Sequence, residues 1–429
     1  MNNVLDIFKE ITTIPRCSGN HEPFINYMKN FASKNEYLCL VDKFNNILCK
    51  KENSKANLCL QNHYDIVCLS DNCVPKIVEE ENFLKAENST LGADNGIGCS
   101  YMLSLMTQGY DCEFLFTSDE EIGLIGANNL EHKLNAQYML NIDSEAEGEI
   151  CIGCAGGVDF FAKNSSKQII ENNENYQLYE VTVSNLPGGH SGVDIHLNVP
   201  NGIKLIAQTI KENNGLILDI NGGERINSIP VNVKAIVAFK NEPKIIPNEN
   251  ICINKIDSKT EHLNVWSSDI CDFIYTFANG VRGYDKDLNV VLNSINLAKI
   301  KTNIDDIEIE LSGRSMSNSN LELLKKETIL LLESFGFEVK TDGKYPAWKP
   351  DVNEFTNMIL DIYKKHNPKA SLEAIHAGLE CAIFKDKFPH MKIASIGPNI
   401  FNPHSTREKV EIKSILNIGK IVKDIVDTF

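Results

Sequence analysis

Basic residues are scarce in this sequence. Its 429 residues include 42 Lys and Arg against 58 Asp and Glu, which gives a formal net charge of −16. Nucleic-acid phosphates and anionic lipid surfaces both need clustered Lys and Arg for binding. The charge balance therefore argues against a general nucleic-acid-binding protein and against docking on an anionic membrane, and we expect neither as a partner.

Long apolar runs are also missing. Nothing approaches the roughly 18 apolar residues of a membrane span, and the N-terminus lacks the basic start and apolar run of a secretory signal. The first residues instead predict a short amphipathic helix, with Val4, Leu5, Phe8 and Ile11 on one stripe. The 13 cysteines are odd in number and scattered, unlike a disulfide framework. We therefore expect reduced thiols and a cytoplasmic location.

What the sequence does contain is the composition of an ordinary globular protein. Hydrophobic residues make up 42% and charged residues 23% of the chain. A length of 429 residues predicts two or three domains. Internal repeats and low-complexity segments are not found.

The first 175 residues alternate apolar runs with helical stretches. Buried strands are predicted at Leu58–Gln61, Cys112–Thr117 and Tyr138–Ile142, with a helical stretch around Met102 between the first two. This alternation is typical of a largely parallel sheet covered by helices. After Pro350 the same pattern resumes and ends in a helix that contains Ile415 to Val426.

In the middle of the chain, the sequence pattern predicts strand pairs with intervening helices. This pattern indicates an α+β domain. The strands are expected at 179–183, 231–239, 292–299 and 306–311, and the helices at 203–211 and 321–335. The stretch Lys340–Pro350 is expected to be a linker because of Gly343, Pro346 and Pro350. The overall prediction is an α/β domain with a mainly parallel sheet, formed by residues 1–175 and 350–429 and interrupted by an inserted α+β domain at 176–349.

Polar residues follow the predicted strands of the α/β domain. In open α/β sheets such residues meet outside the carboxyl ends of the strands. They are Asn62-His63-Tyr64-Asp65, Ser118-Asp119-Glu120-Glu121 and Asp143-Ser144-Glu145, joined by Asp94 in the turn Leu91–Gly96 and by His404 after Gly397-Pro398. Each motif by itself is also typical of a solvated turn or of a histidine that binds no metal. Their order along one chain is the stronger evidence.

This order resembles the co-catalytic di-zinc aminopeptidase-like metallopeptidases, and more narrowly their bacterial dipeptidases. The resemblance covers essentially the whole chain. The segments that carry it are Gln61–Asp65, Thr90–Gly98, Asn141–Glu145, Gly148–Ile150, Gly153–Gly157, Gly188–Gly192, His376–Cys381 and Ser395–Pro398. It implies a zinc-peptidase catalytic domain in which the inserted domain acts as a lid.

The resemblance also implies a centre of two zinc ions. His63 and Asp143 would bind one ion, Glu121 and His404 the other, and Asp94 would bridge them, with a cis peptide bond after it. Imidazole and carboxylate ligands suit zinc, although manganese or cobalt can occupy such a ligand set.

The resemblance gives a catalytic role to two further acidic residues. Glu120 would be the general base. Asp65 lies two residues after His63, on the same side of an extended chain. Its carboxylate is therefore expected to accept the free N–H of His63 and orient the ring.

Further residues resemble the substrate-binding groups of the family. His190 would donate a hydrogen bond to the oxyanion, and Arg314 would bind the C-terminal carboxylate of the substrate. His376, Gly378 and Glu380 are expected to line the pocket. In some dimeric relatives the partner subunit supplies the oxyanion histidine, so the resemblance allows a homodimer as well as delivery of His190 within one chain.

The predicted function is metal-dependent hydrolysis of unblocked dipeptides, including Xaa-His, with a small peptide as the substrate. An N-acyl amino acid amidohydrolase on the same two-metal site is the alternative enzyme, and it differs in needing no free α-amine. A non-catalytic protein with a decayed site would have lost a ligand or Glu120, but all of these residues are present. An acidic partner-binding scaffold leaves the ordered motifs unexplained.

Overall fold

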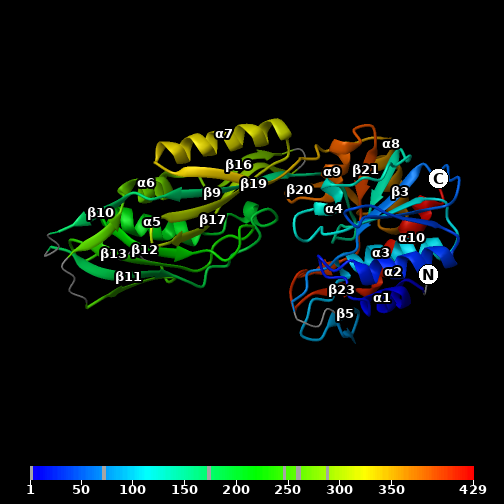
Figure 1. Ribbon diagram of the computed structural model, residues 1–429, viewed down its shortest axis with the longest axis horizontal. Helices are drawn as coiled ribbons and strands as arrows, with labels where there is room; N and C mark the ends of the chain where they lie inside the picture. The colour runs from blue at the N-terminus through cyan, green and yellow to red at the C-terminus, as the bar shows by residue number, and fades with distance from the viewer. Residues whose placement is uncertain (1–2, 70–73, 172–174, 245–247, 258–261, 287–288) are drawn as a thin grey trace. The chain divides into compact units, whose positions relative to one another are not determined.

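A computed structural model describes residues 3–69, 74–171, 175–244, 248–257, 262–286 and 289–429 (Figure 1). The chain divides into two compact units. Unit 1 comprises Met1–Cys154, Trp348–Ala374 and Leu379–Phe429, and unit 2 comprises Ala155–Ala347 and Ile375–Gly378. The described residues 155–171, which are predicted for the first segment of the α/β domain, belong instead to unit 2, and the strand β9 (Gly156–Asn164) is part of its sheet.

The main sheet of unit 1 has a parallel centre. Across the sheet its strands are β1 (Leu38–Val41), β2 (Ile47–Lys50), β6 (Glu113–Thr117), β3 (Leu58–His63), β7 (Tyr138–Asn141), β21 (Lys392–Ser395), β8 (Glu149–Cys154) and β20 (Ser371–Ile375). The neighbours β6, β3, β7 and β21 pair in parallel, whereas β1, β2 and β8 pair antiparallel. Every residue of β3 and β6 is buried, as expected for parallel strands covered on both faces. This confirms the predicted mainly parallel α/β fold.

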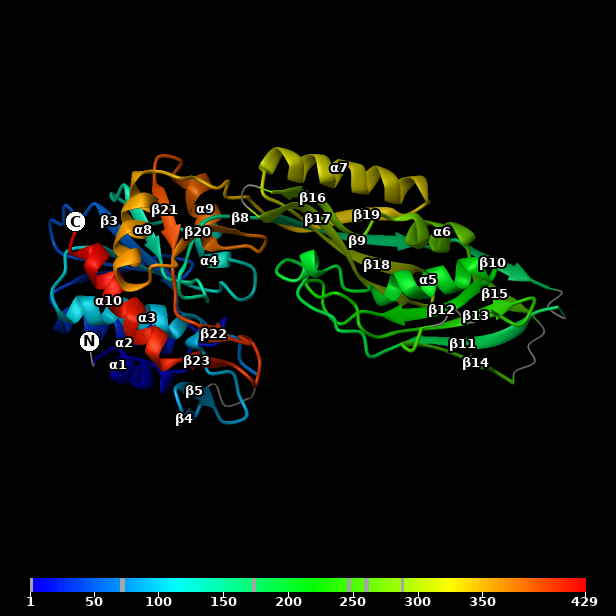
Figure 2. The same ribbon diagram turned by 180° about the vertical axis from the view of Figure 1, so that it is seen from behind.

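Helices and a second, smaller sheet complete unit 1. The helices are α1 (Asn3–Thr12), α2 (Glu22–Lys34), α3 (Ala93–Thr107), α4 (Ile125–Asn128), α8 (Glu354–His366), α9 (Glu380–Lys387) and α10 (Ile412–Val426). The smaller sheet contains, in order, β22 (Ile400–Phe401), β23 (Lys409–Glu411), β5 (Phe83–Ala86) and β4 (Ile77–Glu80). Helix α3 packs against α1 and α10, and α10 packs against α8 (Figure 2). No helix among the described residues is long and apolar enough to cross a membrane.

Unit 2 is built on an antiparallel sheet. Its strands lie in the order β14 (Ile251–Lys255), β11 (Gln177–Val183), β13 (Val233–Phe239), β12 (Leu216–Gly222), β17 (Val290–Thr302), β18 (Ile307–Ser315), β9 and β19 (Glu338–Tyr345), with β16 (Gly280–Asp285) paired to β17. A separate pair is formed by β10 (Lys167–Ile170) and β15 (Leu263–Trp266). Helices α5 (Gly202–Glu212), α6 (Ser268–Thr276) and α7 (Asn318–Ser334) share one hydrophobic core with the sheet, and a 3₁₀ turn spans Ile195–Leu197. The predicted α+β character of the insertion is therefore confirmed.

The expected linker at Lys340–Pro350 is wrong for its first half. Residues up to Tyr345 form β19, which pairs antiparallel with β9. Gly343 has a φ of +62°, and the register shifts between Asp342 and Tyr345. The glycine therefore serves a bulge in an edge strand rather than a loop between domains.

Candidate metal centre

The residues predicted to bind metal meet in unit 1, at the carboxyl ends of its parallel strands. His63 is the last residue of β3, Glu121 follows β6, Asp143 follows β7, Asp94 lies in the first turn of α3, and His404 lies between β22 and β23. The parallel pairing of β3 with β6 and β7 brings the first three together. Asp94 comes from the turn that opens α3, and His404 comes from a segment near the end of the chain.

Asp94 lies between the two histidines. Its Oδ1 is 3.1 Å from His63 Nε2, and its Oδ2 is 3.0 Å from His404 Nε2. His63 Nε2 is also 3.2 Å from Asp143 Oδ1, and His404 Nε2 is 2.9 Å from Glu121 Oε2. Both imidazoles therefore face Asp94. In addition, His63 faces Asp143, and His404 faces Glu121.

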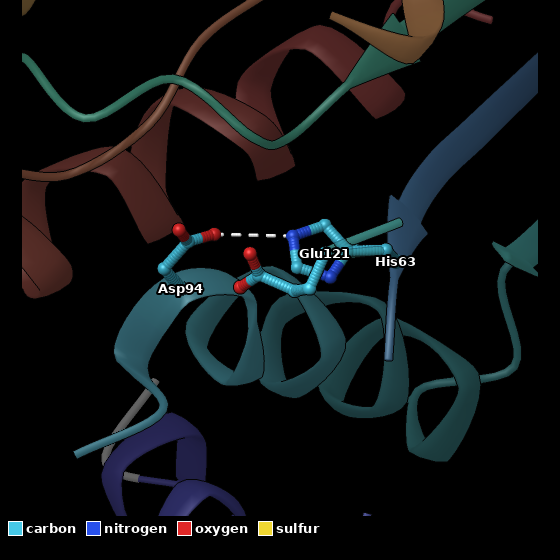
Figure 3. A group of neighbouring side chains, drawn as sticks. All are labelled: His63, Asp94 and Glu121. Atoms are coloured by element: carbon cyan, nitrogen blue, oxygen red, sulfur yellow. Dashed lines mark hydrogen bonds and ion pairs between the residues drawn. The ribbon is translucent and has the colours of Figure 1, made fainter. Parts of the chain in front are cut away.

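This donor set fits a metal. Ligand atoms of His63, Asp94 and Glu121 all lie within 4.8 Å of one another (Figure 3). Glu121 Oε1 is buried and makes no hydrogen bond within the described part of the chain. A buried carboxylate oxygen without a donor costs free energy that a cation would recover. The peptide bond between Asp94 and Asn95 is cis, as the family resemblance implied.

Mutual attraction shifts the pKa values of the cluster. Burial opposes charge on both histidines, but Asp143 and its neighbours raise the pKa of His63 well above its usual value. Hydrogen bonds with Asp94 and Glu121 likewise raise the pKa of His404 to about 11. Burial, together with the charge of Asp94, raises the pKa of Glu121 to about 7. Without an ion, protons provide the positive charge that these carboxylates attract.

Asp65 is oriented differently from the expectation. The backbone oxygen of Asp65, not its carboxylate, lies at hydrogen-bond distance from His63 Nδ1, 3.0 Å away. The nearest carboxylate oxygen is 3.6 Å from Nδ1, too far for a hydrogen bond. The carboxylate instead accepts from Ser18 Oγ at 2.8 Å and from the backbone N–H of Glu120 at 3.1 Å. It thus contributes a negative charge beside His63 and anchors the turn that carries Glu120.

Glu120 and Glu145 are further acids beside the cluster. Burial raises the pKa of Glu120 well above its ordinary value, and the charge of Glu121 adds to this. Burial also raises the pKa of Glu145 to about 8, with Asp94 and Asp143 adding to the effect. Asn95, which the sequence analysis did not single out, donates to Asp143 through its side chain. The only sequence signal for Asn95 is its place after Asp94.

Glu380 lies at the start of α9 and is fully buried. Its Oε2 accepts hydrogen bonds from Gln61 Nε2 at 2.6 Å and Thr117 Oγ1 at 2.7 Å. Its Oε1 is buried and has no hydrogen-bond partner in the described chain. Burial raises the pKa of Glu380 to about 7.

The remaining predicted residues gather in unit 2. A Cβ on Gly192 would lie 2.5 Å from the backbone oxygen of His376, 3.1 Å from His190 and 3.2 Å from Arg314, so these three residues surround one glycine. Gly378 packs on the ring of Tyr345, to which Arg314 Nη1 donates at 2.7 Å. The structure therefore groups His190, Arg314, His376 and Gly378, and places Glu380 in unit 1.

The hydrogen bonds and charges in this group determine which side-chain N–H groups can act as donors. His190 Nδ1 accepts from the backbone N–H groups of Gly192 at 3.2 Å and Val193 at 3.1 Å. The proton of a neutral His190 therefore resides on Nε2, which makes that atom a donor. Arg314 Nε is buried with no hydrogen-bond partner among the described residues. Burial, with the charge of Arg314, lowers the pKa of His376 to about 3 and keeps that ring neutral.

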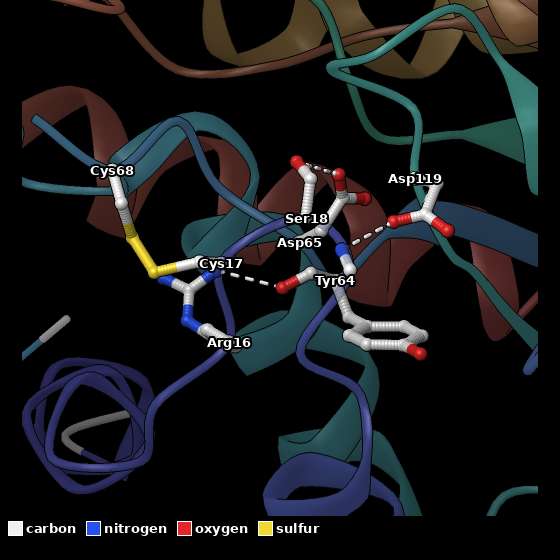
Figure 4. Close-up of a disulfide and its surroundings, with 8 residues drawn as sticks. Arg16, Cys17, Ser18, Tyr64, Asp65, Cys68 and Asp119 are labelled. Atoms are coloured by element: carbon white, nitrogen blue, oxygen red, sulfur yellow. Dashed lines mark hydrogen bonds between the residues drawn. A yellow bond between two sulfur atoms is a disulfide. The ribbon is translucent and has the colours of Figure 1, made fainter.

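One disulfide corrects the expectation of reduced thiols. Cys17 and Cys68 are bonded, with their Cα atoms 5.6 Å apart (Figure 4). A β-bridge between Cys17 and Ile66 brings the two segments together. The ten other described cysteines keep their thiols, and Cys73 lies outside the described residues. Cys17 precedes Ser18, the donor to Asp65, so the disulfide ties two segments beside the cluster.

Comparison with known proteins defines the class. The chain matches Peptidase family M20/M25/M40 over residues 59–428, and it belongs to this family. Family membership confirms the prediction of a peptidase.

Within the family, the chain resembles peptidase D, also called aminoacylhistidine dipeptidase or cytosol non-specific dipeptidase. It is 30% identical to the cytosol non-specific dipeptidase of Escherichia coli (strain K12), over 98% of this chain and 96% of that protein. The crystal structure of an aminoacylhistidine dipeptidase from Vibrio alginolyticus matches with a TM-score of 0.82 and 27% identity, over 100% of this chain and 96% of that chain. A tripeptidase from Staphylococcus aureus shares the fold, with a TM-score of 0.60 and 17% identity, over 99% and 97% of the two chains.

Proposed function

We propose that this protein is a metal-dependent dipeptidase that cleaves unblocked dipeptides, including Xaa-His. The observation that carries the proposal is the Asp94 carboxylate, whose two oxygens face His63 and His404 separately. A carboxylate in this position can bridge two cations, with Asp143 beside His63 and Glu121 beside His404. The names of the two dipeptidase relatives support the substrate class. We propose zinc as the metal, and manganese or cobalt as ions that the same ligands accept.

The two ions would supply Lewis acidity and a water of lowered pKa. Glu120 is the proposed base: it takes a proton from the attacking water and delivers it to the leaving amine. The backbone hydrogen bond from Glu120 to Asp65 holds the turn that presents it.

Unit 2 is proposed to act as the lid that supplies substrate-binding groups. Nε2–H of His190 donates to the developing oxyanion, since its Nδ1 already accepts two backbone N–H groups. Arg314 binds the terminal carboxylate of the dipeptide through donors that include the buried Nε. In unit 1, the buried Oε1 of Glu380 is the proposed acceptor for the free α-amine. A cytoplasmic location, supported by the name of the E. coli relative, and a homodimer complete the proposal.

A peptide panel tests this substrate class. Purified protein is incubated with free dipeptides with and without C-terminal His, a tripeptide and N-acetyl amino acids. The proposal predicts cleavage of the free dipeptides only. Cleavage confined to the acetylated compounds would instead indicate an N-acyl amino acid amidohydrolase. If protein with two bound metals cleaved none of the compounds, the site would be a decayed one.

Replacing Arg314 by lysine is expected to lower kcat/KM for free dipeptides by about 10- to 100-fold, because a point charge cannot replace a planar fork. The C-terminal amides of the same dipeptides have no carboxylate, so their slow cleavage is expected to change little. Steady-state kinetics on both substrate sets measure the difference. Arg282→Lys, at an exposed arginine of the same unit, is the matched control. Equal losses on acids and amides would contradict the assigned role.

Metal binding is expected to release at least about two protons per chain at neutral pH, two from the histidines and a further fraction from Glu121, whose pKa is raised to about 7. The raised pKa values mean that His63 and His404 are protonated in the metal-free protein, and a histidine must lose its proton to bind metal. Apparent metal affinity therefore rises with pH up to the pKa of the histidines. Titration calorimetry in buffers of different ionisation enthalpy measures the release. A binding heat that is independent of the buffer would contradict the ligand assignment.

A further inference from the structure

Glu408 is a buried acid that the sequence analysis did not single out. Its side chain is 1% exposed, and it lies four residues after His404. Its carboxylate lies against the start of α3, where the segment Thr90–Asp94 turns into the helix. Both oxygens accept hydrogen bonds from this segment, which is more than 300 positions away in the sequence.

Five donors of that segment converge on Glu408. Oε2 accepts from the hydroxyl of Thr90, from Leu91 N at 2.7 Å and from Gly92 N at 3.0 Å. Oε1 accepts from Ala93 N at 2.8 Å and from Asp94 N at 3.4 Å. The first N–H groups of a helix have no partner inside the helix. Gly92, at the N-cap, has no side chain to satisfy them, so Glu408 supplies the acceptor from another segment.

The same turn is held from a second side. Arg16 donates from Nη2 to Gly92 O at 2.7 Å and from Nη1 to Tyr64 O at 2.9 Å. The backbone of the turn is not helical at Asp94 and Asn95, and Gly92 has a φ of +68°. Its shape is therefore set by these long-range hydrogen bonds rather than by helix geometry.

The segment 404–408 thus holds Asp94 at two points. His404 Nε2 lies 3.0 Å from the Asp94 carboxylate, and Glu408 accepts from the Asp94 backbone. Beyond Glu408, β23 pairs with β5, with Lys409 opposite Lys85, which fixes the backbone that carries the carboxylate. A bridging carboxylate must present both oxygens at defined positions, so its backbone has to be held as well as its side chain.

We propose that Glu408 is a positioning residue, which fixes Asp94 in the orientation needed to bridge two metal ions. The inference rests on the proposed metal centre and adds a residue that touches neither ion nor substrate. Outer groups that orient metal ligands change metal affinity by about 10- to 100-fold when they are removed. Glu408 is expected to have an effect of this size.

Glu408→Gln is the informative variant because it keeps the shape of the side chain. An amide offers one acceptor oxygen, whereas both carboxylate oxygens face N–H groups. Whichever way the amide turns, its NH₂ group meets backbone donors of the turn. The matched control is Glu113→Gln. Glu113 is also 1% exposed and accepts backbone N–H bonds from Asn135 at 3.0 Å and Ala136 at 3.1 Å, but it lies at the opposite end of β6 from Glu120.

Three measurements separate the two variants. Competition with a chromophoric chelator gives the zinc affinity, and the visible spectrum of the cobalt(II)-substituted protein reports ligand geometry. Urea unfolding of the metal-free protein gives its stability. Both variants are expected to lose stability. Only Glu408→Gln is expected to weaken zinc binding by about 10- to 100-fold and to alter the cobalt spectrum. Unchanged zinc affinity and spectrum in Glu408→Gln, or equal weakening in Glu113→Gln, would overturn the inference.

Thr90→Val provides a milder variant if Glu408→Gln does not fold. It removes one of the five donors to Glu408 and is expected to weaken zinc binding at least about threefold. Wild-type zinc affinity in Thr90→Val would then overturn the inference. Failure of the wild-type protein to bind two zinc ions would instead remove the metal centre itself, so the two failures are distinguishable.

Discussion

Replacing Glu120 by glutamine is expected to lower kcat by about 10²- to 10⁴-fold while both metal ions remain bound. Glutamine keeps the size of the side chain but cannot accept the proton of the attacking water. Glu120 carries no assigned ligand role, whereas the adjacent Glu121 contacts His404 at 2.9 Å. Steady-state kinetics on a free dipeptide, together with elemental analysis of the same sample, measure both quantities.

Glu121→Gln is the contrasting variant at the neighbouring position. It is expected to lose metal, with its activity partly restored at high metal concentration, because it removes a ligand charge rather than the base. Glu79→Gln, at an exposed acid that pairs with Lys9, is expected to change neither quantity. Near-normal turnover by Glu120→Gln, or metal loss equal to that of Glu121→Gln, would remove Glu120 as the base.

Replacing Asp94 by asparagine is expected to lower the affinity for both metal ions by at least about 100-fold. Removal of a group that only orients a ligand already lowers metal affinity by about 10- to 100-fold. The two carboxylate oxygens of Asp94 face His63 and His404, so a single amide oxygen can serve only one side. Equilibrium dialysis against graded zinc concentrations gives the affinity of each site.

Asp143→Asn separates a bridging ligand from a ligand of one ion. Of the two histidines, Asp143 contacts His63. Its replacement is therefore expected to lower the affinity for one ion and to leave the affinity for the other near its wild-type value. If Asp94→Asn also weakened only one ion, Asp94 would not be a bridge. If it bound both ions normally, the ligand assignment as a whole would be wrong.

The sequence carries a strong local signal for the strands and for the residues that follow them. Buried parallel strands are continuous apolar runs, so β3, β6 and β7 are predictable within a few residues, and the polar residues after them lie at one edge of the sheet. His63, Glu121 and Asp143 come together for this reason. Asp94 and His404 lie outside such runs, and only the order of motifs that resembles the family connected them to the site.

The parts that could not be predicted depend on long-range contacts without a local pattern. Glu408 appears in the sequence as one more charged residue beside Arg407 and Lys409, and its partners lie more than 300 positions away. The disulfide depends on a β-bridge that brings Cys17 beside the segment after Asp65. The carboxylate of Asp65 accepts from Ser18 Oγ and from the Glu120 backbone, two donors that lie far from Asp65 in the sequence.

A metal titration of the stripped protein, with a free dipeptide as substrate, tests the proposed two-metal dipeptidase most directly. Hydrolysis is measured after each addition of zinc, with the N-acetylated form of the same dipeptide in parallel. We expect no hydrolysis without metal, full activity at about two equivalents per chain, and no cleavage of the acetylated compound. Hydrolysis that survives removal of all metal would contradict the two-metal centre, as would full activity at one equivalent.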